Sequence, residues 1–256
     1  MTLAVFVLAV VSAARGTWSP CGLSMLSTIT PISERARHHR FWRSACWFVS
    51  GALLGGLTIG GAMALGSWVS HTADVSASAR VAVALLAAIV ALAADARLGG
   101  VRLPERPRQV DATWVTRFRP WAYAGGFGYQ LGTGVATYVM TNATYTMLLV
   151  GLVWLPPSGA LALGAVYGAC RGATILIGAP VTSPSRLRSV HRWLATSDGL
   201  SLAVTMAAQL GFVAVCLVTL DRTAVAVVGG AVVLALAWGC IARVRALVRG
   251  VPAGAP

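Results

Sequence analysis

The sequence predicts an all-α, polytopic membrane protein with about seven transmembrane helices. Of its 256 residues, 57% are hydrophobic and only 11% are charged, and the mean hydropathy is +0.76. Soluble domains carry about 25% charged residues, so the charge deficit is typical of a chain that lies largely in lipid. The spacing of the apolar stretches and the distribution of the arginines, taken next, support the same fold class.

Apolar stretches of about 20 residues, the length needed to cross a membrane, occur seven times. They cover residues 3–30, 44–69, 79–96, 121–154, 159–181, 199–219 and 223–242. The first and the fourth are too long for one straight crossing and contain glycine and polar residues. We therefore expect broken or partly re-entrant helices in both, with freed backbone groups satisfied by neighbouring helices.

The arginines are distributed unequally between the two sides that seven alternating spans would create. Sixteen lie in the loops of one side or in the C-terminal tail, whereas the opposite loops contain only Arg80 and Arg222. Because cytoplasmic loops are enriched in Lys and Arg, we expect a cytoplasmic (bacterial inner) membrane location with the N-terminus outside and the C-terminus inside. The net charge of +13 is then a topology signal, which favours membrane lipid and excludes nucleic acid as a partner.

Two arginines fall within predicted spans. Arg171 lies near the middle of the fifth span, where a charge is costly and is usually paired or functional. No acidic residue is expected at that depth, so Arg171 could bind backbone carbonyls at a broken helix, line a wet cavity or hold an anionic ligand. Arg15 lies closer to the outer face, and its side chain is expected to extend toward water.

The first and fourth spans align as an inverted repeat, which is common in membrane proteins. Pro20, Cys21 and Gly22 then correspond to Gly132, Thr133 and Gly134, and Asn142 belongs to the polar set of the second copy. These residues could line a small polar cavity between two helix breaks, or they could only allow tight helix packing. The predicted single transmembrane domain thus comprises a first half, a basic cytoplasmic linker, a second half, and an extra helix with a basic tail, at 1–96, 97–120, 121–219 and 220–256.

The stretch FVLAVVSAARGTWSPCGLSMLSTITP resembles the first helix of the CcdA/DsbD family, membrane thiol-electron carriers of cytochrome c maturation and disulfide reduction. The shared features are the apolar lead-in, Ser19-Pro20-Cys21 and the later Pro31, together with a glycine-punctuated second span. The resemblance covers about residues 5–70. It implies a redox-active Cys21 and a thioredoxin-like or cytochrome-maturation protein as partner.

The second cysteine of that family would fall at Thr133, which cannot form a disulfide. Cys170 is then the only plausible internal partner for Cys21, provided that their Cα atoms lie within about 7 Å. The cationic Arg171 beside it would increase the reactivity of the Cys170 thiol. Buried cysteines also often serve only as small hydrophobic residues.

Three hypotheses about function follow from the sequence. The first, from the resemblance, is transfer of reducing equivalents across the membrane through Cys21 and Cys170. The second is a transporter for a small anion or sulfur-containing solute, with Arg171 and Arg15 in its pathway. The third is a non-catalytic membrane subunit that binds a redox partner. No metal site or cofactor is expected, and the sequence leaves open whether the chain is an enzyme.

Overall fold

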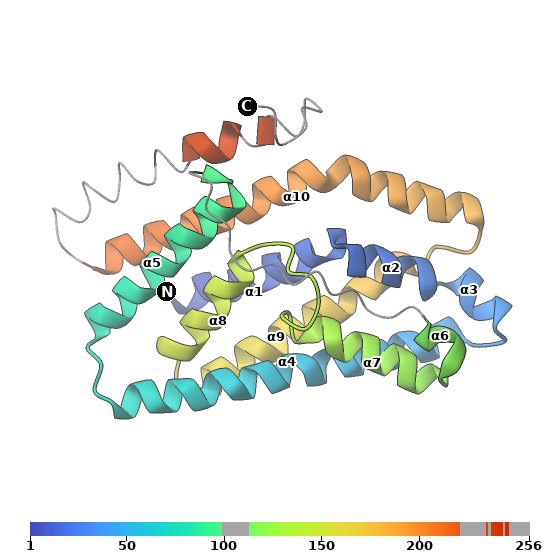
Figure 1. Ribbon diagram of the computed structural model, residues 1–256, viewed down its shortest axis with the longest axis horizontal. Helices are drawn as coiled ribbons and strands as arrows, with labels where there is room; N and C mark the ends of the chain where they lie inside the picture. The colour runs from blue at the N-terminus through green and yellow to red at the C-terminus, as the bar shows by residue number, and fades with distance from the viewer. Residues whose placement is uncertain (99–112, 221–233, 235–236, 243, 246–256) are drawn as a thin grey trace.

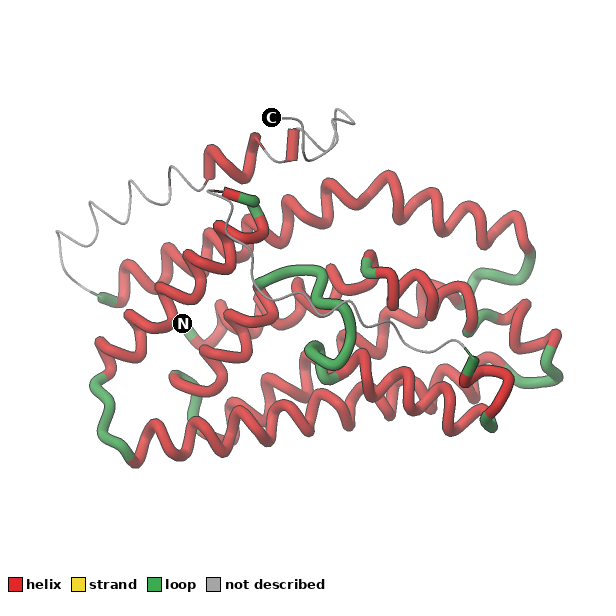
Figure 2. Tube along the Cα trace, in the orientation of Figure 1, coloured by secondary structure: helices red, strands yellow, loops and turns green. Residues whose placement is uncertain are grey.

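The computed structural model describes residues 1–98, 113–220, 234, 237–242 and 244–245. All regular structure in this part of the chain is helical, and the helices form an elongated bundle (Figure 1, Figure 2). Four helices are long and apolar enough to cross a membrane, or five if one bent pair is a single span. The predicted all-α polytopic fold is confirmed. The count of seven spans is not, and most of the predicted span 223–242 lies outside the described residues.

The first half of the chain begins with a broken span. Helix α1 (Thr2–Arg15) leads through the short 3-10 turn η1 (Gly16–Trp18) into α2 (Pro20–Thr28), and the two helical parts are bent by 67°. A short helix α3 (Pro31–Ala36) follows. The long helices α4 (Phe41–Thr72) and α5 (Ala77–Asp95) then run in succession.

The second half repeats this order of a broken span followed by two long helices. After the short α6 (Trp114–Arg117), the chain forms α7 (Pro120–Gly132) and α8 (Ala143–Val153), separated by ten residues without helix. Helix α9 (Pro157–Ala173) continues into the 3-10 segment η3 (Thr174–Gly178), and α10 (Pro184–Thr219) follows. The predicted breaks in spans one and four are therefore present, whereas the inverted repeat and its boundaries stay predictions.

Helix α10 is 36 residues long and begins fifteen residues before the predicted span at 199–219. Ser183 caps its first turn by accepting a hydrogen bond from the Arg186 backbone N–H, and Pro184 occupies a first-turn position where its missing N–H costs nothing. The predicted span was shorter than the helix because hydropathy detects only the apolar part of a helix. The preceding polar part contains no glycine or proline before Gly199 and continues the same helix.

Helix α4 packs against both α7 and α9 and contacts both of their backbones directly. A Cβ atom on Gly56 would lie 2.2 Å from the carbonyl oxygen of Gly164, and one on Gly164 would lie 2.3 Å from the carbonyl oxygen of Gly56. In the contact with α7, a Cβ on Gly128 would lie 2.0 Å from the Phe48 carbonyl oxygen. Such small-residue contacts let helices approach closely without side chains between them.

A buried carboxylate attaches α3 to the helices beside it. Glu34 is fully buried and accepts hydrogen bonds from the Ser44 hydroxyl of α4 at 2.5 Å and from the Tyr123 hydroxyl of α7 at 2.8 Å. The Arg37 guanidinium completes the set at 3.3 Å. Because Ser44 belongs to α4 and Tyr123 to α7, Glu34 fixes the connection between α3 and α4 onto α7.

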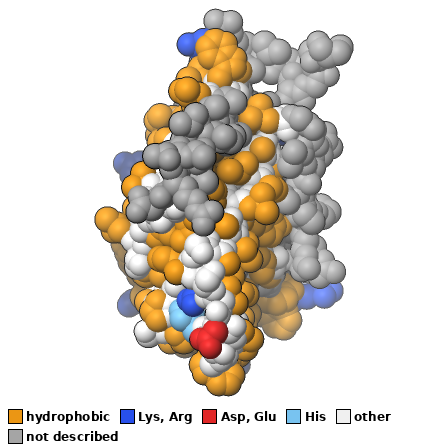
Figure 3. All heavy atoms as spheres, turned by 90° about the vertical axis from the view of Figure 1, so that its left-hand side faces the viewer, with side chains coloured by type: hydrophobic (Ala, Val, Ile, Leu, Met, Phe, Trp, Pro, Cys, Tyr) orange, Lys and Arg blue, Asp and Glu red, His pale blue; other side chains and the backbone are white. Residues whose placement is uncertain are grey.

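The two ends of the bundle differ in charge. The arginine-rich segments around α3, α6 and the start of α10 lie at one end, which we call the basic end (Figure 1). The turn at 73–76 and the last residues of α10 lie at the opposite end. Figure 3 views that opposite end, where most of the visible side chains of the described residues are hydrophobic or uncharged. The described arginines around α3, α6 and the start of α10 thus share one end, whereas those at 102–108 and most of those in the tail lie outside the described residues.

Gly56→Ala should destabilise the protein because its new methyl group meets backbone rather than a movable side chain. Overpacking of this kind costs about 1–3 kcal/mol. Gly61→Ala, on the same helix but with no atom within 4 Å of the added Cβ, is the matched control. We expect the control to be neutral or slightly stabilising, because alanine favours helix by about 1 kcal/mol over glycine. Thermal unfolding of both variants in detergent measures the difference, and equal unfolding midpoints would contradict the close contact.

Candidate functional site

The first helix break is built from Gly16, Ser19, Pro20 and Gly22. Pro20 opens α2, and the Ser19 hydroxyl caps that helix by accepting a hydrogen bond from the Gly22 N–H at 3.1 Å. The same hydroxyl donates to the Gly16 carbonyl at 2.6 Å. A Cβ on Gly22 would lie 2.4 Å from the Thr17 carbonyl oxygen, so the turn requires glycine there. This local pattern of capping serine, proline and glycine explains why the break occurs at these residues.

The Arg171 side chain extends from α9 into the first helix break, between α1 and α2. Its side chain is buried, with 3% of its surface exposed, and it donates hydrogen bonds to the Ala13 carbonyl and to the Ser19 hydroxyl, each at 3.4 Å. A Cβ on Gly16 would lie 2.5 Å from the guanidinium carbon, so the absence of a side chain at Gly16 makes room for the cation. Of the three roles considered for Arg171, the structure shows the binding of a backbone carbonyl at a broken helix.

The charge of Arg171 is balanced by helix geometry. In the described part of the chain, no carboxylate forms an ion pair with it. The last carbonyls of α1 have no intrahelical partner, and the end of a helix carries about half a negative charge. The guanidinium therefore lies where a cation is stabilised. Cys21 and Tyr167 are also close enough to interact electrostatically with it.

The second helix break, between α7 and α8, contacts α9 one turn before Arg171. Gly134 has a φ of +73°, which favours glycine, and a Cβ there would lie 2.7 Å from the Tyr167 hydroxyl oxygen. Tyr167 precedes Arg171 by four residues, so both side chains project from one face of α9. Thr144, in the first turn of α8, is a hydrogen-bond partner of Tyr167. Helix α9 thus touches both breaks, the first through Arg171 and the second through Tyr167.

Thr133 and Gly132 end α7. The Thr133 hydroxyl donates to the Gln130 carbonyl at 2.8 Å and accepts from the Ala136 N–H at 3.3 Å, which is a capping role. A Cβ on Gly132 would lie 2.1 Å from the Ala52 carbonyl oxygen, so Gly132 packs against α4. For Gly132 the structure therefore shows close packing, the simpler of the two roles considered.

Asn142 precedes α8 and is bound to a carboxylate that the sequence did not single out. Asp95, the last residue of α5, accepts hydrogen bonds from the Asn142 backbone N–H at 2.9 Å and from its side-chain amide at 2.7 Å. The Thr141 hydroxyl at 2.5 Å and the Gln209 amide at 2.8 Å complete the set. Asp95 therefore joins α5, the second break and α10. An acidic residue directly after an apolar span was the only sequence signal for this role.

Arg15 does not extend toward water as predicted. It is 4% exposed and forms an ion pair with Asp198 of α10 at 2.6 Å, and it also donates to the Ser201 hydroxyl at 3.2 Å. Trp18 adds a second link to α10 by donating from its indole nitrogen to the Leu194 carbonyl at 2.8 Å. The pairing was missed because Asp198 is 183 residues away in the sequence.

The structure shows no disulfide between Cys21 and Cys170, the two cysteines considered as a redox pair. Neither Cys21 nor Cys170 takes part in a disulfide; Cys21 is buried and Cys170 is partly buried. They pack into different apolar clusters, Cys21 with Met25 and Leu26 and Cys170 at the edge of the cluster around Tyr167. Among the described residues, no group of three or more His, Cys, Asp or Glu side chains could hold a metal ion.

Gly16→Ala and Arg171→Ala should be energetically coupled. In the native background the new methyl group displaces the guanidinium from its two acceptors, but with Arg171→Ala that clash disappears. The double variant should therefore be more stable than the sum of the single variants predicts, by about 0.5–3 kcal/mol. Chemical or thermal unfolding in detergent measures the cycle. As a control, Gly16→Ala and Gly211→Ala should be additive, since the second site is open space on α10; additivity in both cycles would disprove the contact.

Comparison with known proteins identifies relatives of a different kind from the CcdA/DsbD family. The chain is 30% identical over 183 residues to a methylamine utilization protein MauF of Paracoccus denitrificans, covering 70% of this chain and 64% of the relative. It is 30% identical over 199 residues to MauF of Methylophilus methylotrophus, covering 74% and 66%. It is 28% identical over 210 residues to MauF of Methylorubrum extorquens, covering 77% and 71%. No family model and no solved structure matches.

These relatives correct the interpretation of the Ser-Pro-Cys stretch. The resemblance to CcdA/DsbD was wrong, because the matched proteins have another name and the match extends over most of the chain rather than over about residues 5–70. The predicted transfer of reducing equivalents, the transporter alternative and the redox-partner subunit are unsupported by them. The chain spans 64% of the length of the Paracoccus denitrificans protein. By sequence, this multi-pass helical protein is similar to methylamine utilization proteins named MauF.

Proposed function

We propose that this chain is a multi-pass membrane protein that supports methylamine utilization. The observation that carries the proposal is the similarity to MauF proteins of several bacteria over 70–77% of the chain in the alignments above. The matched names give the process and no reaction, so the role proposed here is an accessory one. It is exercised together with another protein of the same process.

The internal contacts fit an accessory role better than a catalytic one. Arg171, Asp95 and Glu34 are polar residues inside the fold, and each is bound by groups from other segments of the chain. Each contact joins segments distant in the sequence, which is the pattern of a scaffold that holds a defined shape. A defined shape within the membrane is what a protein partner would recognise.

The proposal is tested by complementation. A Paracoccus denitrificans strain lacking its own MauF gene should grow poorly or not at all on methylamine, and expression of this chain should restore growth. Growth on a substrate other than methylamine is the control, and it should be the same with and without the chain. If the chain is present in the membrane fraction and growth on methylamine is not restored, the proposed function is wrong.

The basic end of the bundle faces the cytoplasm in this proposal, as the excess of arginine there indicates. Cys46 offers a native probe, because it is an exposed cysteine near the start of α4 at that end. A membrane-impermeant maleimide should leave Cys46 unlabelled in intact spheroplasts and label it in inverted vesicles. Ala73→Cys combined with Cys46→Ser places the probe in the turn at the opposite end and should reverse the result. Labelling of Cys46 in sealed spheroplasts would show the opposite orientation.

A further inference from the structure

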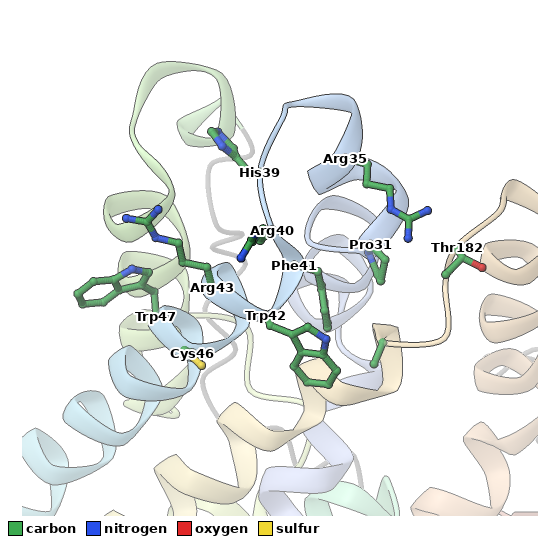
Figure 4. Close-up of a pocket in the computed structure, with 11 residues that line it drawn as sticks. Pro31, Arg35, His39, Arg40, Phe41, Trp42, Arg43, Cys46, Trp47 and Thr182 are labelled. Carbon is green, nitrogen blue, oxygen red and sulfur yellow. The ribbon is translucent and has the colours of Figure 1, made fainter.

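A cavity of about 1070 Å³ opens at the basic end of the bundle. It lies between the connection from α3 to α4 and the connection from η3 to α10. Figure 4 shows Arg43 and Trp47 on one side, Arg35 and Thr182 on the other, and Arg40 with Trp42 between them. None of these residues has a part in the two helix breaks, so the cavity is separate from the site described above.

The cavity is cationic without an internal counter-charge. Arg35, Arg40 and Arg43 line it and are exposed, and within the described residues none of their guanidinium groups forms an ion pair or hydrogen bond. The acidic residue closest in sequence, Glu34, is buried and bound by Arg37, Ser44 and Tyr123. Guanidinium groups bind phosphate oxygens through paired N–H donors. The three free cations therefore favour a phosphate-bearing ligand.

The cavity also has an aromatic wall. Trp42 is 63% exposed and Trp47 is 45% exposed, although both belong to the first two turns of a helix long enough to cross a membrane. Tryptophan at such a position lies at the level of the lipid headgroups, with its ring against the upper acyl chains. A free phosphate ion would gain nothing from these two indoles. A molecule with a phosphate and adjoining acyl chains would contact both parts of the cavity.

We propose that this cavity binds an anionic phospholipid, with its headgroup attracted by the three arginines that line the cavity, Arg35, Arg40 and Arg43, and the start of its acyl chains against Trp42 and Trp47. Basic pockets beside transmembrane helices are known to take lipid headgroups in this way. The bound lipid would neutralise the arginines and complete the packing between α4 and the connection that leads into α10. The proposal is independent of the role in methylamine utilization.

The full chain in detergent should bind phosphatidylglycerol more tightly than phosphatidylcholine, as measured by native mass spectrometry across a lipid titration. The triple variant Arg35→Gln, Arg40→Gln, Arg43→Gln should lose about 100-fold in affinity for phosphatidylglycerol, since each arginine near a lipid surface contributes about fivefold. The single variant Arg43→Gln should lose about fivefold and disturbs the fold least. Inorganic phosphate added in excess should not displace the lipid.

The matched control is Arg117→Gln, Arg188→Gln, Arg192→Gln, which removes three exposed arginines from the same end but none from the cavity. The control should keep most of its affinity. Equal losses in both triple variants would show that net surface charge, not a site, attracts the lipid. Equal binding of both lipids, or displacement by inorganic phosphate, would overturn the proposed ligand. Selective binding of an acidic peptide with no lipid preference would assign the cavity to a protein segment instead.

Discussion

The direct backbone contact of α4 with both α7 and α9 is the constraint on which the rest of the structure depends. Gly56 and Gly164 each occupy the space that a side chain of the other would need, and the absence of a side chain at Gly128 makes room for the Phe48 carbonyl. Because these helices cannot be moved apart without losing the contact, the position and rotation of α9 relative to α4 are fixed. That rotation decides which face of α9 points toward the breaks, and thus where Tyr167 and Arg171 lie.

Three of the inward charges, Arg15, Arg171 and Asp95, are each compensated by a different physical means. Arg15 has a carboxylate, Asp198, whereas Arg171 has the open carbonyl end of α1 and a hydroxyl. Asp95 has neutral donors from three residues and no cation among the described partners. Unpaired buried charge costs several kcal/mol, so each arrangement has to form together with the helix packing that produces it. The polar contacts and the glycine contacts are therefore mutually dependent.

Local features of the fold could be predicted from the sequence, and long-range pairings could not. The breaks followed from Pro20 and from the glycines around Thr133, because proline and glycine act on the backbone where they stand. The partners Asp198 of Arg15 and Asp95 of Asn142 depend on which helices become neighbours, and no local pattern carries that information. The Ser-Pro-Cys stretch led to the wrong family for a related reason. A capping serine followed by proline is a general way to begin a helix, as Ser19 and Pro20 do for α2. The motif therefore indicates a local structure rather than a family.

Helix α10 has a mechanical consequence that follows from its length. Thirty-six residues of α-helix extend about 54 Å, whereas the hydrocarbon core of a bilayer is about 30 Å thick. The helix is therefore longer than one straight crossing needs, and its basic first part packs against η1 and α2 through Leu194 with Trp18 and His191 with Ser27. A force applied to this first part is transmitted along the helix as a tilt of the whole rod. Such a tilt would move Asp198 and Gln209. These α10 side chains bind Arg15 of α1 and Asp95 of α5, and Asp95 also holds the second break.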